Sequence, residues 1–450
     1  MTPNYLVHRD SERDEILHAM GLESIDDLFS HIPEHIRLNR PLDLPPAYSE
    51  WALEQHIRQL ASANRTTRSH LSYIGGGMYE HHIPAVVDAL ANRGEFLTAY
   101  TPYQPEMSQG LLQSLAEYQQ AIAALTGVPV VNSSSYDGAT AMCEGVWVAC
   151  LATVGERIVV SSAIWPQYRQ TLETYLTARN VEIEYVDPDP VTGRLVVADL
   201  QARFADNPPN AFVFQSPNAL GVLEDVKSLG MLCFANRIVS VMGFNPIQSG
   251  IFHPPGKYAI DVVFGDGQPL GIPLSAGGAT LGLLACRKEY RKYMPGRLVG
   301  LVENIDGNPA YALTHEEREQ HVARERATSN ICSNQAWCAL RAVIYLAALG
   351  EGGIRRLARL NARKAHYLAD QLAQVPGVSL TFSGPFFNEF MVTLPKPVSD
   401  VQDALLNEGI FGGIDGRDLG RDDALLMAVT ETKSKADLDH TAEVLAKVLA

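Results

Sequence analysis

The amino-acid sequence predicts an α/β protein that has a large domain with a mainly parallel sheet and a smaller α+β domain at the C-terminus. Short, continuously apolar runs alternate with helical stretches in the middle of the chain, which is typical of a sheet buried on both faces. Polar segments follow several of these runs. The 450-residue chain is also too long for one simple core, so more than one domain is expected.

Three parts are expected along the chain: an N-terminal helical arm (1–70), the large α/β domain (71–310) and the small α+β domain (311–450). The arm begins with two segments that each start with a serine as a predicted helix cap, SERDEILHAMG (11–21) and SIDDLFSHIP (24–33).

A proline-rich extended linker (37–50) follows these two segments, and SEWALEQHIRQLASAN (49–64) then forms a third capped helix. The arm is therefore expected to consist of short helices joined by extended chain.

The large domain opens with two predicted helices. The first covers residues 110–127 and ends at Gly127, and the second covers residues 136–155. Because active sites in parallel sheets lie at the carboxyl ends of strands, the polar segments that follow the strands are expected to line a site. The predicted strands are 157–163, 182–187, 211–217, 237–243, 261–267 and 280–286.

The small domain is expected to start with one long helical region from about residue 311. Strands at 378–384, 388–395 and 424–431 then alternate with helices.

The composition is that of an ordinary soluble globular protein, with 46% apolar and 19% charged residues. No apolar run reaches the length needed to span a membrane. A net charge of −15 argues against nucleic acid or an anionic membrane as the main partner. The charged N-terminal segment is neither a signal nor a transit peptide, and a cytoplasmic location is expected. The six cysteines form no C-x-x-C pair, which favours free thiols and no metal site.

Two glycine- or serine-rich segments are candidates for the site. NSSSYDGATA (132–141) precedes a predicted helix, whose N-terminal N–H groups would bind a phosphate or would simply be capped by Asp137. GGGMYEHHIP (75–84) permits close backbone approach. His81 and His82 point different ways on any regular element, so a loop packed near a site is expected there and not a metal ligand pair.

Two further segments carry hydrogen-bonding side chains. AYTPYQPEMSQG (99–110) is stiffened by prolines and predicts either a ligand-enclosing loop or an interface. RERATSNICSNQ (324–335) places Thr328, Ser329 and Asn330 at an expected helix start after a basic run. These three residues would be a donor cluster for an anion or a plain helix cap.

Several long segments together resemble the first, or α, subunit of two-chain glycine decarboxylase, the P-protein of the glycine cleavage system. The resemblance runs along nearly the whole chain. Besides the segments above it includes SIDDLFSHIPEHIRLNRPLDLP, PPGKYAIDVVFGDGQPLGIPLSAGG, ERATSNICSNQ and SGPFFNEFMVTLPKPV.

This resemblance implies the aminotransferase-like fold of type I pyridoxal phosphate enzymes. It also implies an oxidoreductase activity, glycine dehydrogenase (decarboxylating). With a β subunit, the chain would decarboxylate glycine and transfer the aminomethyl group to the lipoyl group of H-protein.

The resemblance further implies that the β subunit holds pyridoxal 5'-phosphate covalently through its lysine. Residues 261–286 of this chain contain no lysine, and Gln268 to Leu270 lie where the lysine loop is expected. The chain also has Trp165-Pro166 where the family has His-Pro, Asn245 where an acidic residue is frequent, and Gly277-Gly278-Ala279 in place of Gly-Gly-Pro. These departures favour a chain that does not hold its own cofactor.

By analogy with type I dimers, Thr328, Ser329 and Asn330 are expected to bind the phosphate of the partner's cofactor. Tyr100, Tyr103 and Gln104 are expected to act at the catalytic site and to enclose glycine or the lipoyl arm. An α2β2 assembly is expected, with an interface made by the N-terminal helices and the apolar segment AWCALRAVIYLAALG.

Two alternatives stay open. A stand-alone pyridoxal enzyme needs a lysine after a strand end, but Lys257 precedes its predicted strand and Lys288 lies well past the loop. A non-catalytic scaffold would only stabilise its partner. The intact TPYQPE and TSNIC segments argue against a pure scaffold, although packing would also explain them.

Overall fold

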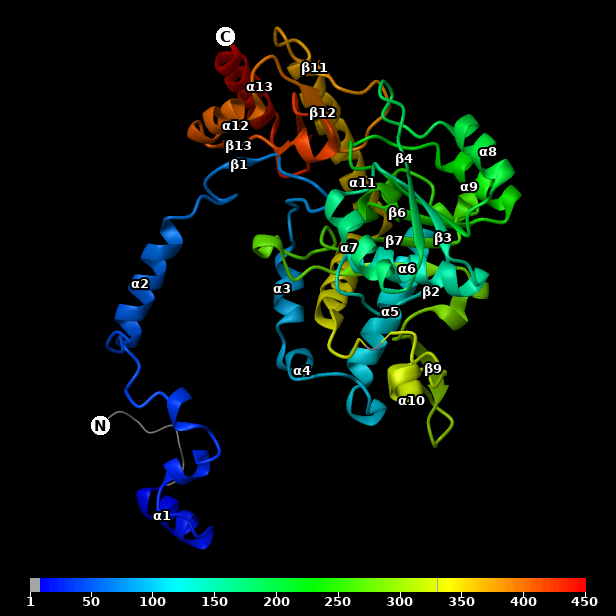
Figure 1. Ribbon diagram of the computed structural model, residues 1–450. Helices are drawn as coiled ribbons and strands as arrows, with labels where there is room; N and C mark the ends of the chain where they lie inside the picture. Colours follow the sequence, from blue (N-terminus) through cyan, green and yellow to red (C-terminus); the bar gives the residue numbers. More distant parts are fainter. Residues whose placement is uncertain (1–8, 330) are drawn as a thin grey trace. The chain divides into compact units, whose positions relative to one another are not determined.

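The computed structural model describes residues 9–329 and 331–450 (Figure 1). The chain divides into two compact units, Met1–Arg65 and Thr66–Ala450. The boundaries predicted at residues 70 and 310 stay predictions.

The first unit contains short helices with almost no core of their own. Among its described apolar residues, Leu17 alone is buried. The predicted caps Ser24 and Ser49 are confirmed, because the side chain of Ser49 accepts from the N–H of Ala52 and Ser24 forms a capping box. The helices are α1 (Asp10–Ala19), η1 (Ile25–Phe29), η2 (Glu34–Ile36) and α2 (Glu50–Ser62).

The cap predicted at Ser11 is wrong. Helix α1 starts two residues earlier, with Arg9 as its N-cap, because the carboxylate of Glu12 accepts from the N–H of Arg9 at 2.7 Å. A glutamate three residues after the cap is the acidic half of a capping box, and it fixes the start of the helix.

A seven-stranded sheet forms the centre of the second unit, in the order β2-β8-β7-β6-β5-β3-β4. The strands from β7 to β4 in this order are parallel, and β2 and β8 are antiparallel to their neighbours. The predicted, mainly parallel sheet is therefore confirmed. The strands are β2 (Val130–Val131), β3 (Arg157–Ser161), β4 (Glu182–Val186), β5 (Ala211–Ser216), β6 (Val239–Phe244), β7 (Val262–Asp266) and β8 (Gly282–Cys286).

Both faces of this sheet are buried. Phe212 and Phe214 on β5 belong to one core cluster, and Val213 between them belongs to another on the opposite face. The predicted caps Gly127 (φ 74°) and Asp137 are confirmed. The helices up to the end of this domain are α3 (Ala85–Ala91), α4 (Gly94–Leu97), α5 (Gln109–Thr126), α6 (Gly138–Thr153), α7 (Pro166–Thr177), α8 (Val197–Asp206) and α9 (Val226–Asn236).

The helical region predicted from residue 311 is wrong as far as residue 335. Instead, β9 (Val299–Glu303) and β10 (Pro309–Leu313) form an antiparallel hairpin, held by two hydrogen bonds between Gln109 and the backbone of Tyr311. The short helices α10 (Gln320–Ala323) and η8 (Arg324–Arg326) follow. The charged side chains that predicted an exposed helix surface form local ion pairs here instead. Arg318, for example, pairs with Glu316 and Glu319.

Helix α11 (Ala336–Leu372) connects the large sheet to the C-terminal sheet and bends at Gly350 (φ 61°) (Figure 1). The C-terminal sheet has the order β11-β12-β15-β14 and is antiparallel. Its elements and their neighbours are β1 (Leu71–Ser72), β11 (Ser379–Leu380), β12 (Glu389–Thr393), α12 (Val398–Asn407), β13 (Ile410–Phe411), β14 (Ile414–Asp415), β15 (Ala424–Ala428) and α13 (Lys435–Leu449).

The expectation that no apolar segment is long enough to span a membrane is wrong, because among the described residues one helix, α11, is long and apolar enough by length and composition. Its residues Ala339, Ala342 and Tyr345 are buried in the large core cluster. Its buried Arg341 donates to the backbone oxygen of Gly271 and pairs with Asp88. One face of α11 thus packs as the core helix of a globular domain does.

Candidate functional site

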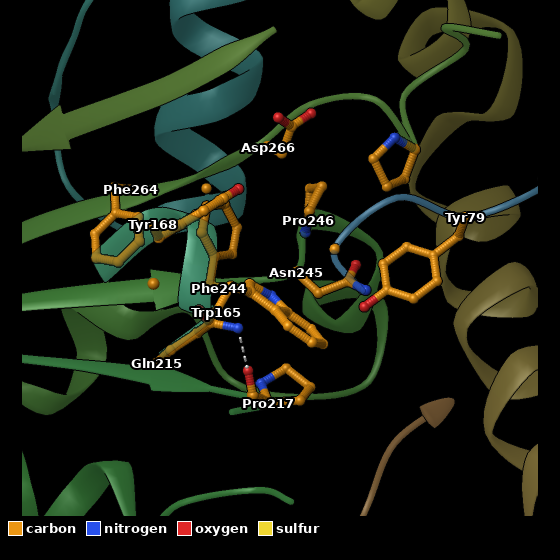
Figure 2. Close-up of a pocket in the computed structure, with 14 residues that line it drawn as sticks. Tyr79, Trp165, Tyr168, Gln215, Pro217, Phe244, Asn245, Pro246, Phe264 and Asp266 are labelled. Atoms are coloured by element: carbon orange, nitrogen blue, oxygen red, sulfur yellow. Dashed lines mark hydrogen bonds between the residues drawn. The ribbon is translucent and has the colours of Figure 1, made fainter. Parts of the chain in front are cut away.

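A pocket lies where the predicted fold places a site, at the carboxyl ends of β5, β6 and β7 (Figure 2). Its volume is about 30 Å³, which is room for about one water molecule. The lining residues come from these three strand ends and the loops after them, from the start of helix α7 and from the glycine-rich segment 75–84: Gly77, Tyr79, Trp165, Tyr168, Gln215, Pro217, Gly243, Phe244, Asn245, Pro246, Phe264, Gly265, Asp266 and Pro269.

Aromatic side chains fill this pocket. Figure 2 shows the rings of Trp165, Tyr168 and Tyr79 around the same small space. Trp165 is 5% exposed, and its indole nitrogen would lie 3.2 Å from a Cβ added to Gly77. Gly77 also has φ +95°, so its conformation favours a glycine, and the adjacent indole leaves little room for a side chain.

The N-terminus of helix α6 is occupied by carboxylates of this chain. Asp266 accepts from the N–H of Gly138 at 3.0 Å, and Asp137 accepts from the N–H of Thr140 at 2.7 Å. Burial raises the pKa of Asp266 to about 6, and the N–H bonds from Gln268 and Gly138 oppose that shift. These contacts favour the capping alternative for the segment 132–141 over a phosphate site.

The loop after β7 is closed by Gln268, in the region where the lysine was expected. The amide of this buried residue accepts from the N–H of Tyr79 at 2.8 Å and donates to the backbone oxygens of Tyr79 and Ile272. All the polar atoms of the Gln268 side chain are therefore engaged within the chain.

Pyridoxal phosphate does not fit this pocket. None of the lining residues is a lysine, and the cavity is far smaller than a substituted pyridine ring with a phosphate. The helix N-terminus that could neutralise the phosphate is already paired with Asp266 and Asp137.

The glycine-rich segment wraps a buried carboxyl group. Glu389 accepts from the N–H of Gly76 at 2.8 Å and from the hydroxyl of Tyr79 at 2.9 Å. Burial raises the pKa of Glu389 to about 7, against the two hydrogen bonds that lower it. The segment thus packs beside the pocket, as expected.

His81 and His82 both contact Glu431. The ring of His81 lies 2.8 Å from one carboxylate oxygen, and the backbone N–H of His82 donates to the other at 2.6 Å. No group of three or more His, Cys, Asp or Glu that could hold a metal ion occurs in the part of the chain that the structure describes.

A second, exposed group of residues brings two of the predicted segments together. We call Tyr100, Tyr103, Gln320, Cys332 and Ser333 the tyrosine cluster. The hydroxyl of Tyr100 lies 2.5 Å from that of Ser333, and the hydroxyl of Tyr103 donates to Gln320 at 3.1 Å and lies 3.9 Å from the sulfur of Cys332. Tyr100 is 75% and Tyr103 41% exposed, so both can meet a partner or ligand.

Gln104 lies beside this cluster. It is exposed, and its backbone oxygen accepts from the N–H of Met107 to start the short helix η3 (Pro105–Met107).

The helix start predicted at residues 328–330 is wrong. Thr328 and Ser329 are half-buried in non-helical chain after η8, and α11 begins only at Ala336. Burial raises the pKa of the Glu144 carboxyl, and the side chain of Ser329 opposes that shift. Asn330 lies outside the described residues.

Sequence reasoning missed two residues beneath the cluster, Arg297 and His321. The guanidinium of Arg297 lies 5.6 Å from the ring centroid of Tyr103 and donates to the backbone oxygen of Cys332. The ring of His321 lies 5.6 Å from that of Tyr103. Burial lowers the pKa of His321, and the charge of Arg297 acts in the same direction. Neither residue belongs to a recognisable sequence motif, so the sequence alone does not indicate that they lie at this cluster.

Comparison with known proteins places these observations in a family context. A family profile described as "Glycine cleavage system P-protein" matches residues 3–445. The "Probable glycine dehydrogenase (decarboxylating) subunit 1" of Desulfitobacterium hafniense is 42% identical over 442 residues, which cover 97% of this chain and 98% of that one.

Solved structures agree. A glycine decarboxylase (P-protein) of the glycine cleavage system, in inhibitor-bound form, has a TM-score of 0.88 at 39% identity and covers 99% of this chain and 100% of that chain. An alanine–glyoxylate aminotransferase from Nostoc sp. has a TM-score of 0.60 at 14% identity, with 93% of this chain and 99% of that chain covered. The aminotransferase-like fold class is therefore confirmed.

Proposed function

The chain belongs to the family of glycine cleavage system P-proteins, and on that premise we propose that it is subunit 1 of a two-chain glycine dehydrogenase (decarboxylating). Its partner is a second subunit, the β chain. Together they decarboxylate glycine and pass the aminomethyl group to the lipoyl group of H-protein.

The cofactor of this enzyme is pyridoxal 5'-phosphate, bound covalently by the β subunit. When bound, it withdraws electrons from the amino acid and so weakens the bond to the carboxylate. The filled pocket of this chain and the hydrogen-bonded Gln268 support this division between the subunits. The opposing arrangement, with a cofactor on this chain, would need both space and a lysine.

The single observation that carries the proposed role of this chain is the contact between Tyr100 and Ser333. It joins the two predicted segments into one exposed, hydrogen-bonding surface. We assign Tyr100, Tyr103 and Gln104 to enclosing glycine or the lipoyl arm and keeping water from them.

The phosphate of the partner's cofactor is assigned to Thr328, Ser329 and Asn330. Their hydroxyl and amide groups are suitable donors to a phosphate, although no helix starts at Thr328 or Ser329. Ser329 would have to turn from the carboxylate of Glu144 toward the phosphate.

Association with the β subunit is supported by the apolar surface of the first unit. This surface includes the exposed side chains of Trp51, Leu53, Ile57 and Leu60 on α2. Exposed apolar patches of this kind mark protein interfaces. We propose an α2β2 assembly that also buries the N-terminal half of α11, and a cytoplasmic location.

Reconstitution tests this function. The chain alone, the β subunit alone and the two together are assayed for release of labelled CO2 from glycine, each with lipoylated H-protein. Activity that requires both chains supports the proposal. Full activity of the β subunit without this chain would mean that this chain is only a scaffold. Activity of this chain alone would make it a stand-alone enzyme.

A further inference from the structure

Arg297 is a buried cation without a carboxylate partner in the described part of the chain. It is 4% exposed. The other buried cations all have such a partner. Arg318 lies 3.0 Å from Glu319, Arg341 2.7 Å from Asp88, and Lys433 2.5 Å from Glu80.

An unpaired buried charge is strongly unfavourable, because the protein interior solvates it poorly. One donor of Arg297 is used, since Nη2 donates to the backbone oxygen of Cys332. An arginine has five N–H donors, and the carbonyl and the ring of Tyr103 provide only partial neutralisation.

A buried carboxylate close by, that of Glu319, which lies against Gly296, is already engaged. Glu319 accepts from the N–H of Leu298 at 3.1 Å and from the hydroxyl of Thr314 at 2.8 Å, besides pairing with Arg318. Arg297 is therefore left for a group that this chain does not supply.

We propose that Arg297 is the anion-binding group of the tyrosine cluster and that it binds an oxyanion, a phosphate or a carboxylate. The guanidinium fork matches either group through two parallel hydrogen bonds. The location supports this, because Tyr103 and Cys332, which Arg297 contacts, both belong to the cluster. The inference rests on the proposed function, in which the phosphate of the partner's cofactor and the carboxylate of glycine both meet at this surface.

The first test uses the purified chain alone and does not depend on activity. The thermal unfolding midpoint is measured with inorganic phosphate, with acetate and with chloride at equal ionic strength. For the wild type we expect phosphate or acetate at about ten times its Kd to raise the midpoint by about 2 °C over chloride. Arg297→Gln loses this increase, whereas Arg326→Gln, at an exposed arginine of the same region, keeps it. An equal increase in wild type and Arg297→Gln overturns the proposal.

The second test separates the two anions in the assembled enzyme. If the anion is the phosphate, Arg297→Gln raises the Kd for pyridoxal phosphate at least about tenfold, followed by absorbance, and leaves the glycine KM unchanged at saturating cofactor. If it is the carboxylate, the glycine KM rises by that factor and the cofactor Kd does not. Unchanged values of both constants overturn the proposal.

Arg297→Lys covers the case in which Arg297→Gln does not fold, because lysine keeps the charge and loses the fork. We expect it to weaken the affected constant by at least about threefold. Wild-type values from Arg297→Lys also overturn the proposal. Inactivity of the wild-type pair would count against the proposed function alone, since the ion effect on the isolated chain is independent of it.

Discussion

The hydroxyl group of Tyr100 lies 2.5 Å from that of Ser333, although 233 residues separate them in the sequence. The contact joins a proline-stiffened loop to the segment that leads into α11. Because both residues are at the surface and not in a core, the contact shapes a site that a partner can complete.

The first prediction concerns the hydroxyl of Tyr103, which donates to Gln320 at 3.1 Å. Tyr103→Phe in this chain is expected to lower glycine decarboxylation by the assembled enzyme at least about tenfold, because one hydrogen bond in a polar site is lost. Asn330→Ala is expected to act in the same way. The rate is measured on complexes shown to be intact by sizing chromatography.

Ser133→Ala is the matched control. Ser133 is buried, and its hydroxyl donates to Gln119, whose oxygen still accepts from the N–H of Val299 at 2.9 Å in the variant. The rate should change by less than about threefold. Equal effects of Tyr103→Phe and Ser133→Ala would remove the tyrosine cluster from the site.

The second prediction concerns Trp165, which fills the pocket at the strand ends. Trp165→Ala is expected to destabilise the isolated chain by roughly 3–5 kcal/mol, because the indole leaves a cavity among packed side chains. The urea midpoint measures this loss. Trp51→Ala, at a 72% exposed tryptophan, should leave the midpoint nearly unchanged. A similar small effect of both variants would mean that Trp165 is not a core residue.

The third prediction follows from Glu389, whose pKa burial raises to about 7. The folded state holds the proton more tightly than the unfolded state, so this group favours folding at low pH and loses that contribution as the pH rises from about 4.5 to 7. Between pH 6 and pH 8 the loss is about 1 kcal/mol.

Glu389→Gln should remove that part of the pH dependence. Glutamine can still accept from the N–H of Gly76 through its amide oxygen, and its uncharged amide replaces the carboxyl group that accepts from the hydroxyl of Tyr79. Urea unfolding of both proteins at the two pH values measures the difference. Parallel changes in wild type and variant would show that Glu389 is ionised at both pH values.

The fourth prediction concerns α2, on which Leu53, Ile57 and Leu60 form an exposed apolar stripe. Ile57→Asp is expected to weaken association with the β subunit at least about tenfold, since a charge would be buried in the interface. Sedimentation of the mixed subunits measures the Kd. Gln59→Asp, on another face of the same helix, adds the same charge and serves as control. Equal affinities of the two variants would exclude this stripe from the interface.

The sequence predicted the large sheet well because its strands are short, continuous apolar runs between helical stretches, and such runs are typical of strands buried on both faces. It failed over residues 311–335, where charges expected on a helix surface pair locally, as Arg318 does with Glu316. For the same reason, no helix starts at Thr328 and Ser329, where the sequence predicted one. Long-range contacts decide this region, such as Gln109 with Tyr311, and no local pattern contains them.

The candidate site was predicted in part. Tyr100 and Tyr103 were found because prolines around them indicate a rigid loop, whereas their contact with residues 332 and 333 depends on the fold. Arg297 was missed, since its significance lies in the missing carboxylate and only a structure shows which charges are paired. The filling of the pocket by Trp165 also appears only when its packing beside Gly77 is seen.

Borohydride reduction of the assembled two-chain enzyme, followed by peptide mapping, shows which subunit holds pyridoxal phosphate. The reduction fixes pyridoxal phosphate to whichever lysine holds it. The proposed division between the subunits predicts a pyridoxyl-lysine on a peptide of the β subunit and none on any peptide of this chain. A pyridoxyl-lysine on this chain, at Lys257, Lys288 or elsewhere, would contradict it.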